Sequence, residues 1–230
     1  VTMAMNLKIN LSGDLELTKL NTNKDLIDGA VFTVTGENGF NREVTVTNGK
    51  IKLEKLKKGI YYIKEKSSPT GYLLNTETYT AEVKPNQTTT QAIVNTEPTG
   101  SITVTKTNTN GDKVQGAKFN IIANEDIYNV ARTVKHYSKG DIVATITTDS
   151  TGIATKTGLP LGKYKVKEIE VPTGYLLNNE QKEVNLKYKD QNTNVIYGSV
   201  TVENEEPTGN LTIEKTDKET GNKNRADQKS

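Results

Sequence analysis

An internal repeat is the feature that most limits how this chain can fold. Three seven-residue segments align without gaps, at 13–19, 100–106 and 209–215, and each opens on glycine and closes on lysine. A longer pattern, Leu-x-x-Gly-x-Tyr-x-x-x-Glu-x-x-x-Pro-x-Gly-Tyr-Leu-Leu-Asn, occurs at 56–75 and again at 159–178 with the same spacing. Self-similarity of this kind predicts a row of similar modules rather than one large core.

A third shared segment marks the ends of the modules. Asn-x-Glu-Pro-Thr-Gly occurs at 95–100 and at 204–209, and the last glycine of each is the first residue of the next repeat. We therefore expect two complete domains, at 13–97 and 100–206, joined by short proline-containing segments that favour a stiff row. Residues 1–12 form an N-terminal flank. Residues 209–230 begin a third repeat, and we expect this truncated stretch to be largely disordered because it cannot bury a core alone.

The residue composition favours an all-β fold with small cores. Thr, Val, Ile and Tyr suit pleated, half-buried surfaces, while 18 glycines together with Asn and Asp supply turns. The second domain is longer than the first because it carries an insertion at 124–139, between expected strands at 119–122 and 143–147. We interpret this insertion as a surface loop with a helical turn at 127–134.

Charge and composition exclude several classes of function. Thirty basic and 28 acidic residues are interspersed along the chain, so no basic stripe is present and nucleic acid is not an expected partner. No apolar run is long enough to insert in a membrane. With no cysteine and one histidine, His136, which we interpret as a solvated surface side chain, we expect no metal site and no cofactor.

The alternation of side chains along the strands predicts that polar residues point into each domain. Alternate residues of a strand share a face, so Lys19 continues the apolar face formed by Leu15 and Leu17. The same phase directs one lysine, one glutamate and one asparagine of each domain inward: Lys19, Glu65 and Asn95, and then Lys106, Glu168 and Asn204.

Two interpretations of these trios stay open on the residue pattern alone. One is a buried Lys–Glu ion pair capped by an amide, or an outward-facing trio if the strand phase is wrong. The other is covalent, because a desolvated neutral amine is a nucleophile and an Asn amide offers an electrophilic carbon. A protonated Glu between them can polarise the carbonyl and shuttle protons, which would give an isopeptide bond and ammonia.

The ordered set of motifs resembles tandem B-type repeat domains of collagen adhesins, found in surface adhesins and pilins of Gram-positive bacteria. The resemblance covers nearly all of 13–209 and includes Gly-Ala-x-Phe at 29–32 and 116–119, beside the opening lysine strand, the Glu pattern and the closing Asn strand. It implies Ig-like or prealbumin-like β-sandwiches with autocatalytic Lys–Asn isopeptide bonds. By position, the cross-linked residues are Lys19 with Asn95 and Lys106 with Asn204, and the catalytic ones are Glu65 and Glu168.

We therefore expect a structural stalk module of a bacterial adhesin or pilin, extracellular and anchored to the cell wall through a C-terminal part of its parent protein. We expect a monomer whose partners are neighbouring domains, with host matrix bound through domains outside this chain. It would not be a turnover enzyme, since each bond forms once. The alternative is an adhesin module that binds a host matrix component through exposed loops, with 124–139 as the candidate surface.

Overall fold

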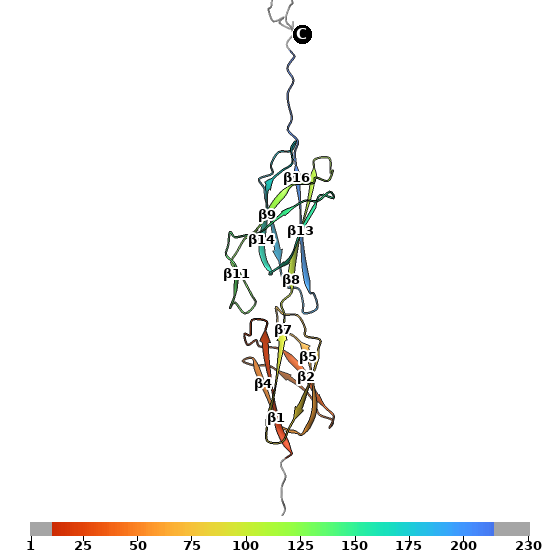
Figure 1. Cartoon of the computed structure of the whole chain (residues 1–230), viewed down its shortest axis with the longest axis vertical. Coiled ribbons are helices and arrows are strands. Elements are labelled where there is room, and N and C mark those ends of the chain that lie inside the picture. The colour runs from red at the N-terminus through yellow and green to blue at the C-terminus, as the bar shows by residue number, and fades with distance from the viewer. Residues whose placement is uncertain (1–10, 214–230) are drawn as a thin grey trace, which may run out of the picture.

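Sixteen β-strands and no helix make up the part of the chain that this computed structural model describes, residues 11–213. Strands β1–β7 form domain 1 and β8–β16 form domain 2, and Figure 1 shows the two domains end to end. The all-β class with two tandem sandwiches is confirmed. Of the stretch that we expected to be disordered, 209–213 has no regular structure, and 214–230 lies outside the described residues.

Two facing sheets form domain 1. The three-stranded sheet has the order β4-β1-β7, and the four-stranded sheet has the order β3-β2-β5-β6. β1 pairs with β7 in parallel, so that Lys19 lies opposite Ile93. The strand bounds are β1 Ser12–Asn21, β2 Val31–Gly36, β3 Asn41–Thr45, β4 Lys50–Lys57, β5 Gly59–Ser67, β6 Thr78–Val83 and β7 Thr88–Asn95.

Domain 2 repeats this topology. Its sheets have the orders β13-β8-β16 and β12-β9-β14-β15, and β8 pairs with β16 in parallel with Lys106 opposite Val202. The bounds are β8 Thr99–Asn108, β9 Lys118–Ala123, β10 Ile127–Tyr128, β11 Lys135–Tyr137, β12 Ile142–Thr147, β13 Ile153–Leu159, β14 Gly162–Glu170, β15 Gln181–Leu186 and β16 Val195–Asn204.

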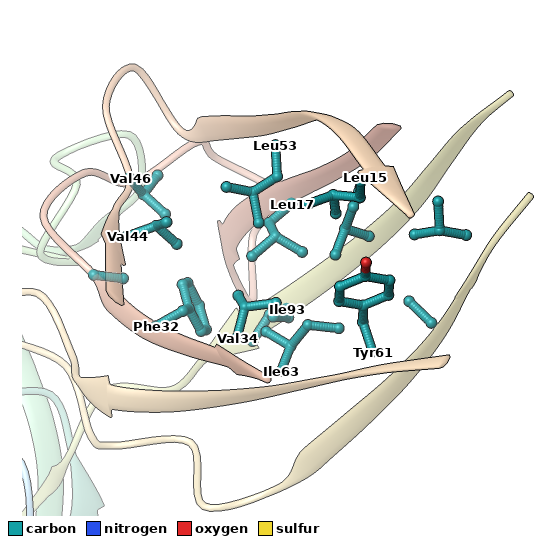
Figure 2. Close-up of a cluster of buried hydrophobic side chains, with 14 residues drawn as sticks. Leu15, Leu17, Phe32, Val34, Val44, Val46, Leu53, Tyr61, Ile63 and Ile93 are labelled. Carbon is teal, nitrogen blue, oxygen red and sulfur yellow. The ribbon is translucent and has the colours of Figure 1, made fainter. Parts of the chain in front are cut away.

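The core of each domain lies between its two sheets. In domain 1, Leu15 and Leu17 from β1 face Phe32 from β2 and Ile63 from β5, and all four are buried. Figure 2 shows these side chains meeting in the space between the sheets. The period-2 burial of β1, in which every second residue is buried, is what carries Lys19 into the same interior.

The insertion at 124–139 forms a β-hairpin, so our interpretation of a loop with a helical turn was wrong. β10 pairs with β11, and the Asn129 side-chain oxygen accepts the backbone N–H groups of Thr133 and Val134 across the turn. Arg132 takes a left-handed φ of 59° there, which a helix does not allow. Ile127, Tyr128 and Tyr137, the β-branched and aromatic residues of the two strands, favour strand pairing over a helix.

The tip of this hairpin reaches domain 1, and Figure 1 shows β11 on the side of domain 2 that faces it. The Val130 N–H donates to Glu97 Oε1 at 2.9 Å, and Thr133 Oγ1 donates to Asp25 Oδ2 at 2.5 Å. Asn129 Nδ2 also donates to Asn23 Oδ1 at 3.3 Å. The hairpin therefore braces domain 2 against the end of domain 1.

The loop between β15 and β16, residues 187–194, makes a second set of contacts with domain 1. The Leu74 N–H donates to the Gln191 carbonyl at 2.8 Å, and the Ser68 N–H donates to the Gln191 side-chain oxygen at 2.9 Å. The Tyr188 hydroxyl donates to the Tyr72 carbonyl at 3.0 Å. Backbone groups of domain 1 are thus satisfied by domain 2, which restrains the angle between the domains.

Removing the hairpin tip should loosen the pair of domains. If residues 129–134 are replaced by an Asn-Gly turn, β10 and β11 can still pair, but the three contacts to Asp25, Asn23 and Glu97 are lost. We expect ¹⁵N relaxation to give one shared rotational correlation time for the native chain, and two distinct ones for the variant once a Gly-Ser segment also replaces 187–194, the other set of contacts with domain 1. Thr145→Val, which removes a hydroxyl from the outer face of domain 2, is the control. Two distinct correlation times when 187–194 alone is replaced would show that the hairpin is not a brace.

Candidate functional site

The structure brings the predicted lysine, glutamate and asparagine of domain 1 together between its sheets. Lys19 on β1 is 0% exposed, Glu65 on β5 is 3% exposed and Asn95 on β7 is 1% exposed. Lys19 and Asn95 come from adjacent parallel strands of one sheet, while Glu65 comes from the facing sheet. The carboxyl group therefore reaches the other two side chains from across the core.

The polar groups of this trio are in direct contact. Lys19 Nζ donates to Asn95 Oδ1 and, at 3.2 Å, to the Ile93 carbonyl. Glu65 Oε1 lies 3.4 Å from Lys19 Nζ, and Glu65 Oε2 accepts a hydrogen bond from Asn95 Nδ2 at 2.9 Å. The carboxyl group thus spans the amine and the amide nitrogen, and the amine lies against the amide carbonyl.

The Pro-x-Gly-Tyr-Leu-Leu-Asn segment of the repeat covers this trio and holds two of its members. The Leu73 carbonyl accepts from Asn95 Nδ2 at 2.8 Å, and the Asn75 N–H donates to Glu65 Oε2 at 2.7 Å. Sequence reasoning assigned no role to Asn75. The signal was present, because Asn closes the pattern at the same spacing in both domains.

Burial changes the protonation of the lysine. Desolvation lowers the pKa of Lys19 to about 8, opposed in part by the negative charge and hydrogen bond of Glu65. The Phe32 ring, 5.8 Å from Nζ, is part of the apolar surroundings. With that pKa, about a tenth of the amine is neutral at pH 7, far more than for a solvated lysine. The neutral form is the nucleophile.

Domain 2 reproduces the frame of the site but not the position of the lysine amine. Asn204 Nδ2 donates to Glu168 Oε2 at 2.9 Å and to the Leu176 carbonyl at 2.8 Å, and the Asn178 N–H donates to Glu168 Oε2 at 2.8 Å. Lys106 Nζ instead donates to two carbonyls, those of Thr107 at 2.7 Å and Val202 at 3.1 Å.

The second site therefore contains unpaired buried groups. Lys106, Glu168 and Asn204 are at most 1% exposed. Glu168 Oε1 and Asn204 Oδ1 have no hydrogen-bond partner, and among residues 11–213 no ion pair joins Lys106 to Glu168. Burial lowers the pKa of Lys106 as well, and the charges of Glu168 and Glu203 oppose that shift. Each unpaired buried polar group destabilises the fold by about 1–3 kcal/mol.

Other kinds of site are not seen in the described part of the chain. Between residues 11 and 213 no group of three or more His, Asp or Glu side chains is placed to hold a metal ion. His136 lies exposed on β11. No helix in these residues is long and apolar enough to cross a membrane.

Comparison with known proteins matches both domains to one family. The family described as the SpaA prealbumin-like fold domain matches residues 13–97 and 100–204. The chain is similar to the solved Bacillus anthracis TIE protein, with 31% identity and a TM-score of 0.65 over 85% of this chain and 34% of that one. It thus spans about a third of that protein. No curated protein sequence matched the chain.

Two further solved structures are more distant. A streptococcal ancillary pilin has 19% identity and a TM-score of 0.38, over 87% of this chain and 64% of that one. GBS52, a minor pilin of the Gram-positive pathogen Streptococcus agalactiae, has 18% identity and a TM-score of 0.37, over 88% of this chain and 100% of that one.

Proposed function

The chain belongs to the SpaA prealbumin-like family, and on that premise we propose that it is a stalk segment of a Gram-positive surface adhesin or pilin, hardened by an isopeptide bond in each domain. The observation that carries this proposal is the contact between Lys19 Nζ and Asn95 Oδ1 with the Glu65 carboxyl group across both nitrogens. On this proposal the segment is extracellular, and its parent protein is attached to the cell wall.

The proposed reaction is a transamidation that expels ammonia. The Lys19 Nζ lone pair attacks Asn95 Cγ, the new N–C bond forms, and the bond from Cγ to Nδ2 breaks. Glu65 Oε1 faces the amine and Oε2 faces Nδ2, so the carboxyl group can take a proton from Nζ and return one to the departing nitrogen. An amine and a primary amide become a secondary amide and NH₃, with no other reactant.

The geometry favours one of the two roles we expected for the glutamate. Both of its oxygens in domain 1 face nitrogen atoms, one of the amine and one of the amide, which suits proton transfer. No hydrogen bond joins Glu65 to the Asn95 carbonyl oxygen in the described structure, where the lysine itself contacts that oxygen. We therefore assign the glutamate to proton transfer rather than to polarising the carbonyl.

In domain 2 the same reaction requires one side-chain movement. The Lys106 amine must leave the carbonyls of Thr107 and Val202 and turn toward Asn204, whose Oδ1 has no partner. We propose that Glu168 then acts as Glu65 does, because its Oε2 already holds the amide nitrogen of Asn204.

The alternative of a purely structural ion pair explains less. Lys19 and Glu65 do form a buried ion pair in domain 1, but the equivalent pair is missing from domain 2, where Glu168 Oε1 has no hydrogen-bond partner. A lysine that bonds only to carbonyls, as Lys106 does, forms no such pair. The arrangement suits a reaction between amine and amide better than a static pair.

The alternative of a host-binding module through the insertion is disfavoured by the hairpin contacts. Its tip donates to Glu97, Asp25 and Asn23 of domain 1, so these groups are engaged within the chain. We propose neighbouring domains of the same surface protein as the partners of this segment. Host matrix would then be bound by other parts of the parent protein.

Intact mass tests the cross-links. We expect the purified chain to weigh two ammonia masses less than its sequence, because each domain expels one. Trypsin does not cut before Pro85 or at a cross-linked lysine, so Asn95 and Lys106 stay on one peptide, 67–113. Tandem mass spectrometry of the digest should therefore yield one doubly branched species, in which 67–113 is joined to 9–24 through Lys19 and Asn95 and to 190–215 through Lys106 and Asn204. The branched species separates this chemistry from ammonia loss by imide formation at the three Asn-Gly pairs, at 38–39, 48–49 and 110–111. A mass equal to that of the sequence would contradict the proposal.

Replacing each glutamate tests its role. Glu65→Gln and Glu168→Gln should each restore one ammonia mass relative to the variant's own sequence, since the amide cannot accept the lysine proton. Glu16→Gln, on the outer face of β1 where Glu16 pairs with Lys50, is the matched control and should keep the full deficit. Complete cross-linking in either core variant would remove that glutamate from the mechanism.

A further inference from the structure

The end of domain 1 that receives domain 2 contains the covering segment 69–74 of the repeat. Tyr72 is 2% exposed, and its carbonyl accepts from Tyr188 of domain 2. A Cβ atom added to Gly71 would lie 2.8 Å from Val130 Cγ1 of the hairpin. The segment is therefore both the cover of the Lys19 site and the surface on which domain 2 sits.

The same segment in domain 2, residues 172–177, is open. Leu176 and Leu177 are 49% and 43% exposed, whereas their counterparts Leu73 and Leu74 are partly buried. A Cβ atom added to Gly174 would meet nothing within 4 Å. Two adjacent leucines on the surface, at positions that are covered in the first domain, indicate a contact surface.

The polar groups that receive the hairpin are also present a second time. Asn23 lies two residues after Asn21, and Asp25 lies four residues after it. The same spacing from Asn108 leads to Asn110 and Asp112. Each Asn holds its Asp through a side-chain hydrogen bond, at 2.9 Å in domain 1 and 3.1 Å in domain 2. The loop that presents the acceptors thus has the same local structure in both domains.

The Asn-x-Glu-Pro-Thr-Gly segment that joins one module to the next, here called the joint, sets the distance between them. Glu97 accepts the Val130 N–H from within the Asn-x-Glu-Pro-Thr-Gly joint, and Glu206 holds the same place in the second joint. The two joints have the same length and differ only at x. A module that starts at Gly209 would therefore begin at the same distance from Leu176 and Leu177 as domain 2 begins from Leu73 and Leu74.

We propose that the open end of domain 2, formed by Asp112, Tyr175, Leu176, Leu177 and Glu206, is a docking surface for a further module of the domain 2 type, joined at Gly209. The occupant must resemble domain 2 rather than domain 1, because the contacts come from the hairpin and the loop 187–194. In domain 1 the corresponding connections are short, at 37–40 and 84–87. The inference rests on the stalk proposal but does not need the isopeptide bonds.

An extended chain tests this surface directly. Residues 1–208 are followed by a second copy of 100–206, so that the added module starts where Gly209 stands. We expect the methyl resonances of Leu176 and Leu177 to shift relative to the 230-residue chain, and their relaxation by a soluble paramagnetic agent to fall several-fold. The three modules should share one rotational correlation time.

Two variants of the extended chain give the control and guard against a misfolded copy. The loop 187–194 is the part of domain 2 that contacts Leu74, so replacing 187–194 of the added copy by a Gly-Ser segment of the same length should return the leucine relaxation most of the way to that of the 230-residue chain. Leu177→Lys should release the added copy to tumble separately, while the dispersed amide spectrum of the copy shows that it is folded.

The outcomes separate this inference from the stalk proposal. A folded third module that leaves both leucines as exposed as before would overturn the docking surface, whatever the mass shows. Leucine shifts that arise in the 230-residue chain only as its concentration rises, and not in the extended chain, would assign the surface to pairing between copies and would also overturn it. Failure of the isopeptide bonds appears instead as a missing ammonia deficit in the same samples.

Discussion

Stretched by its two ends in a single-molecule force experiment, the native chain should show no unfolding step from either domain. Force that enters at the start of β1 crosses from Lys19 to Asn95 through the proposed bond, so residues 20–94 carry no load. Glu65→Gln should introduce a step on the order of 250 Å, since each released residue adds about 3.5 Å. Glu168→Gln should introduce a longer step, on the order of 330 Å, from residues 107–203.

The control for this experiment is Glu16→Gln, which changes an exposed carboxylate on the same strand as Lys19 and should leave the force trace without a step. Native molecules that release both steps would show that neither bond is in the load path. A native chain with the longer step alone would show that Lys106 has not reacted. The mass of the same preparation would then show one ammonia loss where two are expected.

Thermal unfolding should separate the cross-linked and uncross-linked forms of domain 1 by a wide margin. Closing the loop between Lys19 and Asn95 restricts the unfolded chain as a disulfide would, which stabilises by about 4–5 kcal/mol in the chain-entropy estimate. For a domain of this size that corresponds to a fall of about 20–30 °C in Tm for Glu65→Gln. Differential scanning calorimetry measures the shift.

Glu65→Gln is preferred to Lys19→Ala for this measurement, because the glutamine keeps the volume of the side chain and leaves no cavity around Phe32. Glu16→Gln should unfold with the native chain. If the Tm of Glu65→Gln lies within a few degrees of the native value although its mass shows no cross-link, the bond does not govern the stability of the domain.

The residues of the candidate site could be found from the sequence because β-strands alternate. Each landmark strand is buried on one face, so the phase of Leu15 and Leu17 is enough to place Lys19 in the interior. The repeat then strengthens the inference, since an error of one residue would have to occur in the same place twice.

The contacts made by segments without a second copy could not be predicted. The hairpin at 124–139 has no counterpart in domain 1, and its turn depends on the Asn129 side chain and on a left-handed Arg132 rather than on a periodic pattern. The direction of the Lys106 amine, toward Thr107 and Val202, depends on rotamers that the strand phase does not determine.

The parallel pairing of the first and last strands of each domain determines how the length of such a protein depends on the number of its modules. A chain that enters and leaves along the same direction emerges at the far end of the domain, as the described chain does in Figure 1. An antiparallel pair would return it to the end where it entered. Each duplicated module therefore adds its full length to the row, and reach grows in equal increments for copies of one module.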